Sequence, residues 1–142
     1  MSVTLITPVL TRAQFELNPG FKADAGGGLP ADLHLHHFLT RKEGANEAVV
    51  ALRLQVNQRE ETRLEGAPFW LEVEYTAKII WSEDVAPEEI DSYLYVNVPA
   101  VLIGYIRPVV AGMTSISPMP TYTLPFINVN GLFSAKDEAT AL

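Results

Sequence analysis

The chain has 142 residues, the size of a single domain with its own core, and 48% of them are hydrophobic. Its formal net charge of −7 disfavours nucleic-acid phosphates and anionic lipids as partners, whereas a basic protein partner is compatible with it. The sequence has no cysteine, which excludes disulfides and thiol catalysis, and its first residues do not match a secretory leader, so we expect a cytoplasmic location.

Four segments alternate between apolar and polar residues, as half-buried strands do. They cover residues 9–17, 31–39, 47–59 and 69–81. A glycine-rich loop, residues 21–30, follows the first segment, and polar turns join the other three. This series predicts an antiparallel meander or a Greek key.

After the fourth segment the pattern changes to that of helices. Pro87 is followed by two glutamates, and acidic side chains favour the first turn of a helix, so a short helix is expected there. A longer helix is expected from Pro99 to about residue 113, with Asn97 as its N-cap and a kink at Pro108.

The longer helix is apolar on nearly every side, whereas a surface helix of a monomer has one apolar stripe. A membrane span is disfavoured because Arg107 and Pro108 interrupt the apolar run after roughly ten positions. We therefore expect a second subunit to cover this helix. The residues expected at that interface are Val101, Leu102, Tyr105, Ile106 and Val109.

A proline-rich loop, residues 117–125, leads into the last segment. Residues 127–142 are interpreted as a short C-terminal helix with Val129, Leu132 and Phe133 on one face, weakened by Gly131. Strands followed by helices indicate an α+β domain.

No group of residues predicts catalysis or a cofactor. His34 and His36 share a face with Asp32, but a metal site needs three or four converging ligands, and the sequence offers no other His or Cys besides His37. The glycines at 26–28 lack the Lys and Ser/Thr of a phosphate-binding loop. We therefore do not expect an enzyme, a metal or a cofactor.

Four stretches resemble, in the same order, motifs of the SecB family of protein-export chaperones. Residues 98–107, VPAVLIGYIR, are similar to the family's C-P-N-I-L-F-P-Y-x-R, with Ile-Gly-Tyr in place of Phe-Pro-Tyr. Residues 120–133, PTYTLPFINVNGLF, are similar to P-x-L-x-L-x-P-V-N-F-x-A-L-F. Residues 15–19, FELNP, resemble F-E-x-P-N, and residues 69–73, FWLEV, resemble F-L-C-E-V.

The resemblance implies one SecB-like domain over residues 1–142, ending in a short tail, residues 134–142. In such a domain a four-stranded antiparallel sheet carries a long and a shorter helix on one face. Two dimers associate with their long helices between the sheets, giving a homo-tetramer. The implied activity is that of an ATP-independent holdase, which binds unfolded or preprotein clients in protein export without making or breaking bonds.

The resemblance also implies two contact surfaces. A client groove would lie between the second strand, the glycine-rich loop and the C-terminal helix. Its expected residues are Phe21, Leu29, Leu33, Leu35, Val129, Leu132 and Phe133. A SecA-type motor would contact Glu16 and Glu72, but Arg12 on the same face and the short tail predict weak coupling.

Three questions stay open at this point. The chaperone could instead serve one dedicated client, as in a toxin–antitoxin or phage-encoded system. The chain could also be a small-ligand-binding α+β module of a different class. For Leu33 and Leu35, a place in the ordinary core is as compatible with the pattern as a place in a groove.

Overall fold

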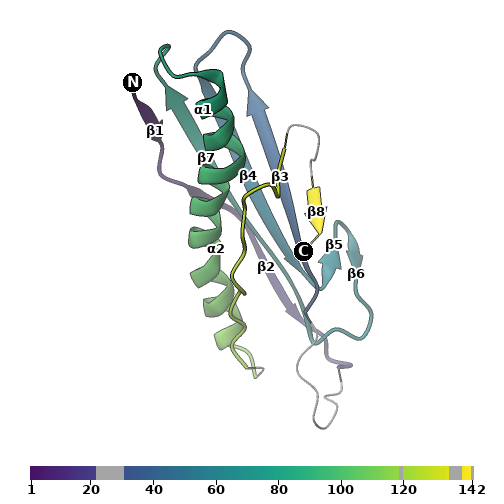
Figure 1. The fold of residues 1–142 in the computed structure, drawn as a ribbon. Coiled ribbons are helices and arrows are strands. Elements are labelled where there is room, and N and C mark those ends of the chain that lie inside the picture. Colours follow the sequence, from purple (N-terminus) through teal and green to yellow (C-terminus); the bar gives the residue numbers. More distant parts are fainter. Residues whose placement is uncertain (22–30, 119, 135–138, 142) are drawn as a thin grey trace.

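The computed structural model describes residues 1–21, 31–118, 120–134 and 139–141, and it consists of an antiparallel sheet with a helix along one face (Figure 1). The strand order is β1-β7-β4-β3-β8, and β2 pairs with β7 on the same side as β1. The strands of this sheet are β1 (Val3–Leu5), β2 (Val9–Leu17), β3 (Leu33–Arg41), β4 (Glu47–Val56), β7 (Phe69–Trp81) and β8 (Ala139–Ala141). Two short strands, β5 (Gln58–Arg59) and β6 (Thr62–Arg63), form a separate hairpin.

The four strands predicted from alternation are confirmed as β2, β3, β4 and β7. The third predicted segment, residues 47–59, ends earlier than expected: β4 stops at Val56 because Asn57 has a positive φ of 62°, and β5 begins after it. The predicted loop at 21–30 lies outside the described residues except for Phe21, and so does most of the predicted tail at 134–142. Strands β1 and β8 were not predicted, because three residues are too few to show a period.

The inner face of the sheet carries the core. Leu35 of β3 pairs with Leu54 of β4, and Leu54 pairs with Val73 of β7, so inward side chains line up across three strands. Their exposed fractions are 1%, 0% and 0%. Full burial of side chains of this size stabilises the fold by about 1.5–3 kcal/mol each, so the alternation fixes which face of the sheet meets the helix.

Within the described residues, one continuous helix covers this face, instead of the two that were predicted. It begins with α1 (Pro87–Ser92), continues through a π-helical turn η1 (Tyr93–Asn97) and ends with α2 (Val98–Ser115). Asn97 does not cap a new helix, because its φ and ψ of −69° and −48° are helical and its side chain makes no capping bond. The amide of Val98 bonds to the carbonyl of Tyr93, five residues back, so the chain passes into Pro99 without a break.

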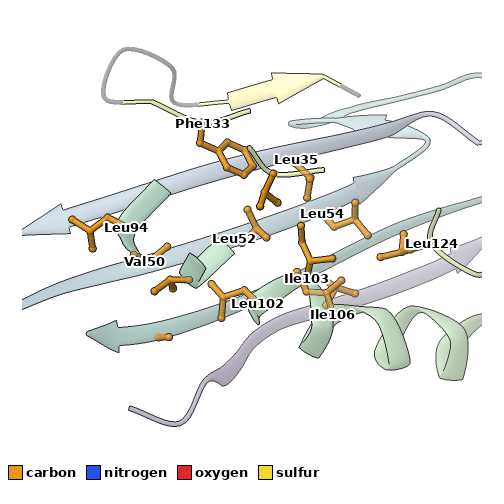
Figure 2. Close-up of a cluster of buried hydrophobic side chains, with 14 of the residues drawn as sticks. Leu35, Val50, Leu52, Leu54, Leu94, Leu102, Ile103, Ile106, Leu124 and Phe133 are labelled. Carbon is orange, nitrogen blue, oxygen red and sulfur yellow. The ribbon is translucent and has the colours of Figure 1, made fainter. Parts of the chain in front are cut away.

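The buried side of the helix belongs to the core of the chain. Leu94, Leu102 and Ile106 are each at most 1% exposed and point to the sheet (Figure 2). By length and composition alone, residues 87–115 resemble a membrane-spanning helix. Their packing against the sheet is that of a core helix of a soluble domain.

A histidine of β3 compensates the π-helical turn. In a regular helix the carbonyl of Leu94 would accept a bond from the amide of Val98, but that amide bonds to Tyr93, and Pro99 has no N–H. The Nε2 of His37 lies 3.0 Å from this carbonyl oxygen. A carbonyl only accepts, so Nε2 carries the proton and donates it. This bond ties the sheet to the irregular part of the helix.

We expect the stability of the fold to fall in mild acid because of this histidine. Burial lowers the pKa of His37, and the bond to Leu94 opposes only part of that effect. The folded pKa then lies below the ordinary value of about 6.5, so the unfolded chain binds more protons between the two values. The contribution is fully present above pH ~6.5 and is lost as the pH falls through the folded pKa.

Urea unfolding between pH 7.5 and 5.5 measures this effect. The urea midpoint should be constant at the upper end and should fall below pH ~6.5. A His37→Gln variant should show a shallower fall, because Gln can donate the same bond without titrating. The remaining slope should come from His34, whose pKa is also lowered by burial and by the neighbouring His36. An identical slope in the variant and the wild type would contradict this role of His37.

The predicted C-terminal helix is wrong. The described residues after Ser115, 116–118 and 120–134, form no helix and run back as an extended segment beside α2 on the helix-covered face (Figure 1). Gly131 has a φ of +75°, which a right-handed helix does not allow. Hydrogen bonds hold the segment to α2: the amide of Tyr122 donates to Thr114 Oγ1 at 2.9 Å, and Arg107 Nη1 donates to the carbonyl of Leu124 at 2.5 Å.

Candidate functional site

An exposed aromatic side chain stands out on the helix-covered face. Phe126 is 91% exposed, although it lies between Leu124 and Val129, which are 3% and 7% exposed. The two buried residues anchor the segment on both sides, and the side chain of Arg107 also holds the carbonyl of Pro125, at 3.3 Å. The backbone around Phe126 is therefore fixed while its ring is left in solvent.

Two hollows flank this ring. The first has a volume of about 330 Å³ and lies toward β3, where Ala31 and Leu33 form a wall opposite the segment from Pro125 to Asn128. The second has a volume of about 360 Å³ and lies toward α2. Its walls are Ala100, Ile103, Gly104, Arg107 and the segment from Phe126 to Asn130. Both hollows are open to solvent, and Phe126 forms part of the rim of each.

The sequence of α2 explains the second hollow. Gly104 has no side chain, and a Cβ built there would meet no atom within 4 Å. The guanidinium of Arg107 is turned toward the carbonyls of Leu124 and Pro125, so it does not fill the space. The result is a shallow, mostly apolar recess suited to hydrophobic side chains of a bound molecule.

The predicted groove residues fall into two groups. Leu33 lines the first hollow, and Phe21 and Leu132 are half-buried. Leu35 and Phe133 lie in the hydrophobic core (Figure 2). Phe133 stacks on His37 at a centroid distance of 5.0 Å. Val129 belongs to the same core and also lines the second hollow. Leu29 lies outside the described residues. Val129, Leu132 and Phe133 were expected on a C-terminal helix, which is absent from the described part of the chain. The client groove itself stays a prediction.

Sequence reasoning missed Phe126, Ala31, Ile103 and Gly104. A usable signal was the pair Pro125-Phe126, because a proline beside an aromatic residue in a segment without period places a bulky side chain on irregular backbone. The glycine in α2 was noticed only as a departure from the SecB motif. Its role in opening a recess depends on which side of the helix faces the returning segment.

The predicted interface residues lie on two sides of the helix. Leu102 and Ile106 are 0% and 1% exposed and pack into the chain's own core. Val101 and Tyr105 are each 40% exposed, and Val109 is half-buried. In this structure only the last three offer surface to a second subunit, so the interface prediction applies to them.

The outward face of the sheet carries a polar network around Glu72. This side chain points outward as predicted, but the residue is only 3% exposed. Its carboxylate accepts bonds from Arg12 Nη1 at 2.8 Å and from Gln55 Nε2 at 2.7 Å. Gln55 Oε1 in turn lies 2.8 Å from Nε2 of His36 and accepts from the amide of Glu60, also at 2.8 Å.

The other acidic side chains of this face are also paired. Arg53 Nη2 lies 2.9 Å from Glu74, and Glu16 forms an ion pair with Arg63, whose guanidinium lies over the ring of Trp70. Arginines therefore neutralise the acidic groups that were predicted to meet a basic motor. The motor contact itself stays a prediction.

The histidines do not gather around a common point. The rings of His34 and His36 lie together on the outward face, 4.4 Å apart, whereas His37 points inward to Leu94. Among the described residues, no three His, Cys, Asp or Glu side chains are grouped so as to hold a metal ion. His36 instead belongs to the Gln55 network.

Comparison with known proteins assigns this arrangement of elements. The sequence from residue 31 to residue 140 matches the family model described as SecB, preprotein translocase subunit SecB. A similar solved structure is the SecB-like chaperone Rv1957 of Mycobacterium tuberculosis in complex with a ChAD peptide from the Rv1956 HigA1 antitoxin. Its TM-score is 0.67 and its identity 22%, over 89% of this chain and 91% of that one.

A second similar structure is a protein of unknown function from Streptococcus agalactiae, with a TM-score of 0.50 and 18% identity over 89% of this chain and 98% of that one. At these identities the two structures indicate a shared fold. No curated protein is significantly similar to the sequence.

Proposed function

Because the chain belongs to the SecB family, we propose that it is an ATP-independent holdase that binds unfolded or preprotein segments of client polypeptides. The observation that supports this function is the exposed ring of Phe126 between two open, largely apolar hollows. A lone exposed apolar side chain is common on soluble proteins, so the support comes from its place between two apolar hollows, which together form a contiguous apolar surface of the kind that binds other polypeptides. No chemical step is part of the proposed function.

The mechanism is burial of client side chains. An apolar residue of the client covers Phe126, and its neighbours enter the hollows toward Leu33 and toward Ile103. Burying one large apolar side chain contributes about 1.5–3 kcal/mol, so several are needed for tight binding. The hollows are shallow and make few directional bonds, which favours many apolar sequences over one.

Phe126→Asp is expected to abolish most of the holdase activity without unfolding the chain. The ring is almost fully exposed, so its loss costs the fold little, whereas a carboxylate in the client site must be desolvated on binding. The loss of about 1.5–3 kcal/mol corresponds to roughly tenfold or greater weakening. The measurement is turbidity after dilution of a denatured client into chaperone, with and without ATP, at a series of chaperone concentrations.

Ile116→Asp is the matched control. Ile116 is 86% exposed and follows α2, away from both hollows. This variant should protect clients as the wild type does, and ATP should change none of the results. Equal protection by Phe126→Asp and by the wild type would contradict the proposed site. A wild type that protects no client would contradict the holdase function.

A second candidate is a chaperone dedicated to one client. Two observations favour it: Rv1957, which shares the fold, is seen with an antitoxin peptide, and the acidic groups on the outward face of this sheet are neutralised by Arg12, Arg53 and Arg63. Protection of one antitoxin-like client but of none in a panel of preproteins would favour the dedicated function over export.

We further propose that the chain works in the cytoplasm as a homo-tetramer, a dimer of dimers. The support is the exposed apolar side of α2, where Val101 and Tyr105 are each 40% exposed and could be buried against a second copy of the helix. Coupling to a SecA-type motor is expected to be weak for the reason given above.

A further inference from the structure

The edge of β3 accepts an extended segment. β8 pairs antiparallel with it in the register His34↔Ala141, Leu35↔Thr140 and His36↔Ala139. β3 has nine residues, and β8 pairs with three of them, His34 to His36. β8 thus pairs with only a third of the length of β3.

β8 is a weak occupant of this edge. It consists of Ala-Thr-Ala, three residues of which two are alanine, a residue depleted in strands. A pairing over three residues makes few ladder bonds, whereas typical strands have about five or six residues. A longer extended segment that pairs with more of β3 would therefore make more ladder hydrogen bonds to this edge than β8 does.

The register of β8 leads toward the proposed client site. From Ala139 to Ala141 it runs from His36 to His34, that is, toward the start of β3. An extended strand rises about 3.4 Å per residue, so a segment that continues in this direction next passes Leu33 and then Ala31. These two residues form the β3 wall of the first hollow beside Phe126. Residues of the segment opposite Leu33 and Leu35 face the same side of the sheet as that hollow.

We propose that the edge of β3 binds the client backbone by strand addition, and that β8 is an internal competitor which the client displaces. This inference rests on the proposed holdase function and specifies how the same site recognises its client. The partner is an unfolded polypeptide segment in extended form, with apolar residues at alternate positions. Main-chain bonds to β3 supply affinity that is independent of sequence, and the hollow beside Phe126 selects the apolar side chains.

The test compares two double variants of β8. Ala139→Pro with Thr140→Pro removes the N–H of two adjacent residues, and one of them must face β3 because neighbouring amides point to opposite sides of a strand. Ala139→Ser with Thr140→Ser keeps both amides and the chain length and serves as the control. The probe is a fluorescent dodecapeptide of alternating valine and threonine with terminal lysines, titrated by anisotropy. A second peptide carries N-methyl groups on alternate residues along one edge.

The proline variant should bind the first peptide about three- to tenfold more tightly than the wild type, because the binding-competent fraction rises when β8 leaves the edge. The serine variant should bind like the wild type, and the N-methylated peptide should bind weakly to all three. Among residues 34–36, the amides that face β8 should be protected from hydrogen exchange in the free wild type, unprotected in the free proline variant and protected again when the peptide is bound, whereas those that face β4 should stay protected throughout.

Equal affinity of the proline variant and the wild type would overturn the competition, and equal affinity for both peptides would overturn strand addition. Turbidity assays on the same proteins separate this inference from the proposed function. If all variants protect denatured clients equally while peptide binding ignores β8, the holdase function stands and the β3 edge is excluded. If no variant binds peptide or client, both are excluded.

Discussion

Tyr105→Asp is expected to dissociate the assembly and leave the chain folded, whereas Ile106→Asp, one residue further along, is expected to unfold the chain. Tyr105 is 40% exposed and packs on Tyr75 at a centroid distance of 5.5 Å, so an aspartate there stays hydrated in the monomer. In a helix-to-helix interface the same carboxylate would be buried without a partner. An unpaired buried charge costs several kcal/mol, which is enough to separate subunits.

Ile106 has the opposite surroundings. It is 1% exposed in the core between α2 and the sheet (Figure 2). Truncation of such a side chain costs about 2–5 kcal/mol, and the buried carboxylate adds to this. The total stability of a domain is about 5–15 kcal/mol, so little or none should remain.

Light scattering and circular dichroism on both variants and the wild type decide between these effects. We expect a tetramer for the wild type, a smaller folded species for Tyr105→Asp and a loss of helical signal for Ile106→Asp. A folded wild-type monomer at micromolar concentration would remove the assembly proposal. An unchanged mass for Tyr105→Asp would place the interface elsewhere on the chain.

The strands were predictable because their information is local. In β7 every second residue from Phe69 to Trp81 is apolar, and a sheet with one covered face requires that period. The family was also predictable from its four motifs, two of which lie on α2 and β7, and the match over residues 31–140 confirms it. The α+β class and the antiparallel sheet follow from the same elements.

The continuous helix was not predictable, because its irregular turn depends on a distant residue. Pro99 is as suitable for the first turn of a new helix as for the position after a π-helical turn. What decides between them is the bond from His37 to the carbonyl of Leu94, and these residues are far apart in the sequence. The helix propensities of neighbouring residues cannot predict a hydrogen bond to a residue so far away in the sequence.

The C-terminal segment was predicted wrongly for a different reason. Val129, Leu132 and Phe133 have the spacing of one helix face, and the same spacing arises when an irregular segment lays apolar side chains on a sheet. Gly131 and Pro125 favour irregular backbone over a helix. Whether the segment takes that form also depends on its contacts with Arg107 and Thr114 of α2, which the local sequence does not show. Consequently the pair Pro125-Phe126 indicates a bulky side chain on irregular backbone, but the sequence does not show that its ring is exposed.

The exposure of side chains on the outward face of the sheet could also not be predicted from the sequence. Alternation places Glu72 on the correct face, but it says nothing about what lies on top of it. Arg12 comes from β2 and Gln55 from β4, and together they cover the carboxylate. An acidic residue that looked like surface in the sequence is a buried member of a polar network.

Glu72→Ala is therefore expected to lower the free energy of unfolding by about 2–4 kcal/mol, a large effect for a residue on the outward face of a sheet. The change leaves one N–H of Gln55 without its carboxylate acceptor and removes the charge that faces Arg12. Breaking such a buried pair costs about 3–5 kcal/mol, and the expected loss is smaller because Arg12 is half-exposed and regains water.

Glu16→Ala is the control for this measurement. Its side chain is 58% exposed and pairs with Arg63 at the surface, where an ion pair contributes about 0–1 kcal/mol. Urea unfolding of the two variants should therefore separate a network residue from a surface residue. Calorimetry of the wild type with a SecA-type motor should show weak binding, because Arg12 and Gln55 cover Glu72 on the outward face and Arg63 neutralises Glu16. A Glu72→Ala variant as stable as Glu16→Ala, together with tight motor binding by the wild type, would show that this face is a free acidic docking surface.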